Sequence, residues 1–92
     1  MLTHSVYLEK IMTKEVISLY KAHKNSILKI TSVPKVELLQ GLGLGVGTQV
    51  KVQNRYTFGG PVLLLVEESY SVAVGKDIAT QIAVMEVGAS EF

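Results

Sequence analysis

Apolar and polar residues along the second half of the chain follow patterns typical of short β-strands. Residues 48–53 alternate strictly between polar and apolar side chains, which indicates a strand with one buried face. Residues 62–66 are instead apolar throughout, as in a strand covered on both faces. Five short strands spaced about ten residues apart predict a mainly β protein, a small antiparallel barrel. The segments expected to be strands are 27–30, 48–53, 62–66, 70–74 and 82–87.

One short helix is expected between the first two strands. The valine and leucine residues of 36–42 recur at i/i+3 and i/i+4, which gives a helix one apolar stripe. Pro34 suits the first turn because its missing N–H is not needed there, and Gly43 follows as a left-handed stop. The pattern therefore predicts a helix over 34–42. A single helical turn is expected at 75–79.

Length and composition limit the chain to one globular domain. It has 92 residues, of which 48% are hydrophobic and 18% are charged, and this balance argues against intrinsic disorder. Residues 1–16 contain helical spacings and a candidate N-cap at Ser5, so we expect them to form an N-terminal extension with a short helix. Residues 17–92 are expected to form the domain. No apolar run near the start has signal-peptide length, so the protein is expected to be cytoplasmic.

Charge is unevenly distributed along the chain. The formal net charge is only +1, which excludes a protein dominated by a large basic field for nucleic acid. Residues 1–35 hold six Lys and two Glu, a net charge of +4, while 36–92 hold three basic and six acidic residues, a net charge of −3. Such a separation of charge can orient a protein against a partner, or it can simply keep each face hydrated.

Candidate chemistry is sparse. The chain has no cysteine, which excludes disulfides, iron–sulfur clusters, thiolate zinc sites and cysteine nucleophiles. His4 and His23 are the two histidines, and neither has a second ligand at a suitable spacing for a site that needs three or four. Glu67 and Glu68 are adjacent, so in a strand they would point to opposite faces. We therefore expect no enzymatic activity, no cofactor and no high-affinity metal site, while weak metal binding stays open.

The glycine-rich run at 41–47 invites comparison with phosphate-binding loops. The dinucleotide-binding pattern fails, because Val46 and Thr48 stand where a glycine is needed and the run follows a helix instead of a strand. Gly75-Lys76 also lacks the flanking residues of a P-loop. A helix stop followed by a turn into a strand is the favoured interpretation, with Gly47 at a positive φ.

Tyr56 and Phe58 form an aromatic pair that shares a face if the strand continues. Such a pair can stack bases or hold a peptide, but only Lys51 and Arg55 accompany it, so packing within a hairpin is favoured over nucleic-acid binding.

The order of these motifs resembles the FeoA family, the small ferrous iron transport protein A. Residues 42–52 read Leu42-Gly43-Leu44-Gly45-Val46-Gly47-Thr48-Gln49-Val50-Lys51-Val52, similar to the family segment Leu-Gly-Leu-x-Pro-Gly-Thr-x-Val-x-Val. The turn Gly59-Gly60-Pro61 and the closing strands at 70–74 and 79–84 match later family features, and the likeness spans about 17–87. Three positions depart from the pattern: Val46 replaces proline, the segment 67–69 replaces glycine, and Asn25 replaces an early glycine that asparagine can imitate.

The resemblance implies a small SH3-like five-stranded barrel without enzymatic activity. It also implies an accessory protein that binds and modulates the cytoplasmic part of FeoB, the membrane ferrous iron transporter. The alternative is a regulatory SH3-like domain related to that of iron-dependent transcriptional repressors. We expect no nucleic-acid partner and no membrane insertion, and weak homo-oligomerisation stays open. The expected partner contacts are Leu42, Leu44, Tyr56 and Phe58, with the alternative, which is favoured, that Leu42 and Leu44 are core residues. The expected structural turns are Gly43, Gly47, Gly60 and Pro61.

Overall fold

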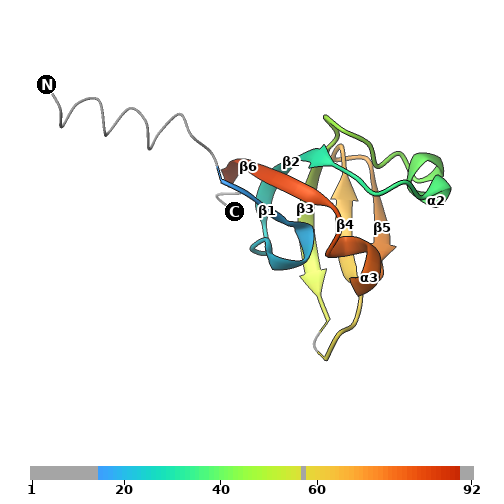
Figure 1. Ribbon diagram of the computed structural model, residues 1–92. Helices are drawn as coiled ribbons and strands as arrows, with labels where there is room; N and C mark the ends of the chain where they lie inside the picture. Colours follow the sequence, from blue (N-terminus) through green and yellow to red (C-terminus); the bar gives the residue numbers. More distant parts are fainter. Residues whose placement is uncertain (1–14, 57, 90–92) are drawn as a thin grey trace, which may run out of the picture.

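The described residues of the computed structural model, 15–56 and 58–89, form one antiparallel sheet with three short helices (Figure 1). The strand order in the sheet is β1-β6-β2-β3-β4-β5. The strands are β1 (Val16–Ser18), β2 (Ser26–Ser32), β3 (Gln49–Arg55), β4 (Val62–Val66), β5 (Tyr70–Val74) and β6 (Ala83–Ala89). The helices are the 3₁₀ turn η1 (Leu19–Lys21) and the α-helical segments α2 (Glu37–Gly41) and α3 (Lys76–Ala79).

The sheet wraps around a single apolar core. Burial alternates along β2, β3 and β4, as the period of two residues in a strand requires. Val52 from β3, Leu64 from β4 and Val84 from β6 belong to one cluster, so strands that are distant in the sheet pack on the same interior. Leu19 of η1 and Ala79 of α3 close the core at one end, and Leu39 and Leu44 close it at the other. The full cluster comprises Leu19, Ala22, Leu28, Ile30, Leu39, Leu44, Val50, Val52, Val62, Leu64, Val66, Val74, Ala79, Ile82 and Val84.

The mainly β architecture predicted from the sequence is confirmed, with three differences. The sheet has six strands where five were expected, because Val16–Ser18 pairs with β6 through Val16↔Met85 and Ser18↔Ala83. The sheet is also open, since β1 and β5 are its two edges and are not paired with each other. Helix α2 covers Glu37–Gly41, shorter than the predicted 34–42. The helix expected before Val16 falls outside the described residues.

A β-bulge near the end of β3 changes the side of the sheet to which the following side chains point. The register runs Val52↔Leu64 and then Asn54↔Leu63, so β3 has one extra residue at Gln53. Arg55 is therefore paired with the core residue Val62 and points to the interior side of the sheet. Its Nε and Nη2 are buried without a hydrogen-bond partner among the described residues.

The sheet has two distinct ends, and they are named here by their helices. The α2 end comprises residues 33–48 and 67–70, and the α3 end comprises 19–25, 53–56, 58–61 and 75–79. Figure 1 shows α2 and the tip of the β3–β4 hairpin far apart on either side of the sheet. No helix among the described residues is long and apolar enough to span a membrane.

Candidate partner-binding site

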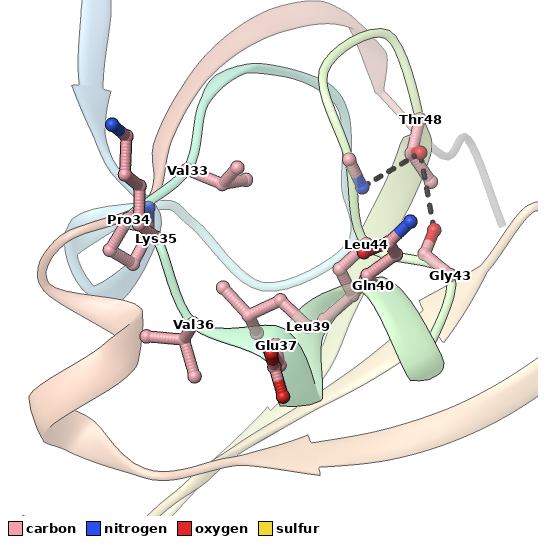
Figure 2. A pocket seen from close by; sticks show the side chains of 11 residues that line it. Val33, Pro34, Lys35, Val36, Glu37, Leu39, Gln40, Gly43, Leu44 and Thr48 are labelled. Carbon is pink, nitrogen blue, oxygen red and sulfur yellow. Dashed lines mark hydrogen bonds between the residues drawn. The ribbon is translucent and has the colours of Figure 1, made fainter.

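The α2 end contains a pocket of about 610 Å³ between the segment that precedes α2, the helix itself and the loop that follows it (Figure 2). Val33 points from the β2–α2 segment into this space, and the residues of the loop form the opposite wall. The lining residues are Val33, Pro34, Lys35, Val36, Glu37, Leu39, Gln40, Gly43, Leu44, Gly45 and Thr48.

The helix end that forms the pocket floor is a Schellman motif. The N–H of Gly43 donates to the carbonyl oxygen of Gln40 at 3.1 Å, and the N–H of Leu44 donates to that of Leu39 at 2.9 Å. Gly43 has φ +80°, the left-handed conformation that this motif needs. The motif turns the chain so that Leu39 and Leu44 meet, with exposures of 3% and 1%. The floor is consequently apolar and fixed by backbone hydrogen bonds.

The far wall is a tight turn held by one threonine. The N–H of Thr48 donates to the carbonyl oxygen of Gly45 at 3.1 Å, and Gly47 has φ +91°, as at the third position of a type II turn. The Thr48 hydroxyl accepts from the Gly45 N–H at 3.2 Å and donates to the Gly43 carbonyl oxygen at 3.3 Å (Figure 2). Two further hydrogen bonds tie this loop to Ile30 of β2. The predicted positive φ of Gly47 is found, and the turn gives the pocket a rigid wall.

Polar and apolar side chains accompany the apolar floor. Lys35 and Glu37 are among the lining residues. Leu38 on α2 and Val46 in the loop are outside the lining but belong to the same two elements, and they are 65% and 70% exposed. An apolar floor with a mixed rim suits a single apolar side chain presented by a partner, because the side chain leaves water while neighbouring polar groups pair at the rim.

The structure separates the four residues expected to contact a partner. Leu42 is half-buried and Leu44 belongs to the core, so Leu44 offers no surface to a partner. Tyr56 and Phe58 are exposed by 48% and 103%, but they lie at the α3 end. The four residues therefore do not form one surface, because the whole length of β3 separates the hairpin from the helix end.

Sequence patterns missed the residues that give the pocket its shape. Val33 is half-buried on irregular backbone between β2 and α2, where no periodicity marks it. Val36 belonged to the predicted apolar stripe, but it is the half-buried N-cap of α2 and not part of the helix. Leu38 was part of the predicted apolar stripe, yet a helix of five residues buries only Leu39. An unusually short helix carrying two consecutive leucines was the one signal that could have indicated an exposed side chain here.

The pocket has no cluster of metal-ligating side chains beside it. Within 15–56 and 58–89, no group of three or more His, Asp or Glu side chains is placed to hold a metal ion.

Comparison with known protein families identifies the family to which this chain belongs. The family model described as the FeoA domain matches residues 17–86. The chain belongs to the FeoA family. The family resemblance inferred from the motifs is therefore confirmed, and the match covers the SH3-like fold from β1 into β6.

Solved structures agree with this assignment. The FeoA domain is similar to the crystal structure of an iron uptake regulatory protein, FeoA, with a TM-score of 0.72 and 20% identity over 79% of this chain and 99% of that one. It is similar to the solution structure of a FeoA-like protein from Clostridium acetobutylicum, with a TM-score of 0.70 and 24% identity over 88% and 96% of the two chains. These likenesses establish the fold. No significant match is found among curated protein sequences.

The same fold occurs within larger regulators. A manganese-dependent transcriptional repressor is similar with a TM-score of 0.73 and 16% identity, over 82% of this chain but only 44% of the repressor. The likeness therefore concerns one part of that protein. It shows that the SH3-like fold described here is shared between stand-alone FeoA proteins and metal-dependent repressors.

Proposed function

We propose that this protein is a cytoplasmic accessory protein of ferrous iron transport that binds the cytoplasmic part of a FeoB-type membrane transporter and modulates it. Membership of the FeoA family is the observation that carries the proposal. The pocket supports it, since the described residues form a mainly apolar cavity whose floor and wall are fixed by hydrogen bonds.

The pocket at the α2 end is the proposed contact. Its floor and wall are fixed by the Schellman motif and by the Thr48 hydrogen bonds, so little ordering is needed when a partner binds. Leu38 adds an apolar side chain, 65% exposed, on the helix that lines the pocket. A partner side chain in the pocket, with Leu38 packed beside it, gives a small buried centre of the kind that dominates binding energy.

The test is a titration of the protein against the soluble cytoplasmic domain of the transporter, with its nucleotide bound and absent. Leu38→Glu places a charge beside the pocket, and we expect it to weaken binding about tenfold or more, since a charge is costly at a desolvated centre. Val87→Glu is the matched control, because Val87 is 41% exposed on β6, a strand that contributes no residue to the pocket lining, and this change should leave the affinity unchanged.

Two results would contradict the proposal. The first is absence of binding in both nucleotide states together with unchanged iron uptake in a deletion strain. The second is equal weakening by Leu38→Glu and Val87→Glu, which would place the contact elsewhere.

The second candidate function is regulation, as an SH3-like domain of the kind found in iron-dependent repressors. The observation that favours it is the TM-score of 0.73 with a manganese-dependent repressor. The two candidates differ in their partner. Tight binding to operator DNA or to a repressor, with no affinity for the transporter domain, would support the regulatory function.

A further inference from the structure

An aromatic tip projects from the α3 end, opposite the pocket. Phe58 lies in the β3–β4 connection and is 103% exposed, so none of the described residues covers its ring. Tyr56, at the other side of the same tip, is 48% exposed. Phe58 and Gly59 have φ values of +60° and +78°, which makes the turn abrupt. A fully exposed phenylalanine at a loop tip is unfavourable in water and suits an apolar or interfacial environment.

One lysine lies against this tip, and two more belong to the same end of the sheet. The Nζ of Lys76 lies 5.6 Å from the centre of the Tyr20 ring, and a Cβ built on Gly59 would be 3.7 Å from the Lys76 Cδ, so Lys76 lies between the tip and η1. Lys21 follows Tyr20 in η1. Lys24 precedes Asn25, whose N–H donates to the carbonyl oxygen of Val52 at 2.8 Å.

The two ends of the sheet differ in charge. Among the described residues, the α3 end has Lys21, Lys24, Arg55 and Lys76 against the single carboxylate of Asp77. Arg55 points to the interior side of the sheet, and its buried Nε and Nη2 have no hydrogen-bond partner among the described residues. The α2 end has Lys35 against Glu37, Glu67 and Glu68. The folded domain therefore carries excess positive charge around its aromatic tip and excess negative charge at the opposite end.

We propose that the α3 end binds peripherally to the surface of an anionic lipid bilayer. Phe58 and Tyr56 enter the headgroup layer, where aromatic rings are favoured, and Lys21, Lys24 and Lys76 lie over the anionic headgroups. Long lysine side chains keep their charge at the headgroup level while the tip reaches deeper. The aromatic tip is convex and the two exposed rings flank a turn. A bilayer surface fits this shape better than a nucleic acid, which needs a groove or a flat stacking platform.

This contact would orient the molecule. With the α3 end on the bilayer, the α2 end and its pocket face away from the lipid, and the acidic side chains of that end are held far from the negative surface. The inference goes beyond the proposed function and is tested without any transporter, so the two proposals can fail separately.

A fluorescence experiment tests the inference directly, because the chain has no tryptophan. Phe58→Trp introduces a single probe at the tip, and Leu38→Trp places the matched probe at the α2 end. We expect the emission of the Trp at position 58 to shift to shorter wavelength with phosphatidylcholine vesicles that contain about 30% phosphatidylglycerol. Pure phosphatidylcholine vesicles should produce no comparable shift, and the Trp at position 38 should be unaffected by either.

Vesicle co-sedimentation then measures separately how much the lysine charge and the aromatic ring contribute to binding. Lys76→Gln should weaken binding to the anionic vesicles about fivefold, since one basic residue near such a surface contributes about 1 kcal/mol. Lys35→Gln removes the same charge at the α2 end and should have a much smaller effect. Phe58→Ser should weaken binding about tenfold, the effect of taking one aromatic ring out of an apolar environment. Leu38→Ser is its control, and raising the salt concentration should weaken binding of the unmodified protein.

The inference would be overturned by any of three results. One is absence of binding to anionic vesicles at low ionic strength. Another is equal weakening by Lys76→Gln and Lys35→Gln, which would indicate a non-specific effect of net charge. The third is binding to single-stranded RNA or DNA in place of vesicles, with Phe58→Ser abolishing it.

Discussion

The hydroxyl of Tyr70 donates a 2.6 Å hydrogen bond to the carbonyl oxygen of Leu42. Tyr70 is the first residue of β5, an edge strand, and Leu42 is the C-cap of α2. The bond joins elements 28 residues apart and holds the helix end, and with it the pocket floor, against the sheet. The Cα of Gly43 lies directly against the Tyr70 hydroxyl, since a Cβ at position 43 would overlap the hydroxyl oxygen. The pocket therefore depends on one tyrosine and one glycine that contact each other.

Tyr70→Phe should lower the free energy of unfolding by about 0.5–1.5 kcal/mol, the usual net contribution of one hydrogen bond. Tyr70 is 43% exposed, so solvent can hydrate the freed carbonyl and the loss should fall in the lower part of that range. Denaturant unfolding monitored by circular dichroism measures it. Tyr56→Phe is the matched control, because no hydrogen bond of the Tyr56 hydroxyl is found among the described residues. Equal losses in both variants would contradict a special role for the Tyr70 bond.

Gly43→Ala and Gly47→Ala should both destabilise the protein, by unequal amounts. Both residues have positive φ, which costs an alanine about 1–2 kcal/mol. A Cβ at Gly47 meets nothing within 4 Å, whereas at Gly43 it would overlap the Tyr70 hydroxyl, so Gly43→Ala should cost more. The excess should shrink when Gly43→Ala is made in a Tyr70→Phe background, as a double-mutant cycle measures. Simple additivity of the two changes would show that the contact does not matter.

The β4–β5 turn contains two glutamates in a left-handed conformation. Glu67 and Glu68 have φ values of +50° and +57°, the pattern of a type I′ turn, in which glycine or asparagine is preferred. Glu67 also makes a stabilising contact, since its Oε2 accepts a hydrogen bond from the Gln49 N–H at 2.8 Å. Glu68→Gly should therefore stabilise the protein by about 1 kcal/mol. Glu67→Gly should gain less, because it loses the bond to Gln49, and Glu68→Gln controls for the change of charge. Thermal unfolding of the three variants decides the order.

Much of the fold was predictable because most strands have a clear period. The alternation at 48–53 and the apolar run at 62–66 correspond to β3 and β4, and Asn25 has the left-handed φ of +71° inferred from its replacement of glycine. Strand β1 was missed since three residues are too few to show alternation, and its apolar side chains fitted the helical spacing expected upstream.

The site was less predictable, for reasons that lie in the tertiary structure. The bulge at Gln53 changes the face of every later residue of β3, so a strict period of two assigns Arg55 to the wrong side. The helix end and the Tyr56 hairpin lie at opposite ends of β3, and the strand predicted at 48–53 already stands between them in the sequence. The pocket itself arises from irregular backbone at 33–36, where the apolar stripe predicted the first turn of a helix.

Titration calorimetry with ferrous iron under anaerobic conditions, and with zinc, should detect no stoichiometric binding tighter than micromolar. A high-affinity site needs three or four well-placed ligands, and the chain offers two histidines and no cysteine. The described residues also contain no cluster of three His, Asp or Glu side chains. Tight binding that disappears in His4→Ala or His23→Ala would contradict this expectation, and it would favour the regulatory function over the transport accessory.

Val46→Pro should stabilise the protein by about 0.4–1 kcal/mol, mainly by restricting the unfolded chain. Val46 occupies the second position of the turn closed by Thr48 N–H and the Gly45 carbonyl, where proline is favoured in type II turns. Its φ is not positive, and no backbone hydrogen bond of its N–H is found among the described residues, so the ring removes no observed interaction. Thermal unfolding should show an increase in Tm of about 2–8 °C.

Val46→Ala is the control for Val46→Pro, because it shortens the same exposed side chain without fixing φ. The alanine variant should leave Tm close to that of the unmodified protein. A lower Tm for the proline variant would show that the turn at 45–48 differs from type II. If Val46→Pro stabilises as expected, the rigid pocket wall should also preserve or strengthen binding of the transporter domain, since less of the loop remains to be ordered. Stabilisation accompanied by a loss of binding would mean that this wall must move when the partner enters the pocket.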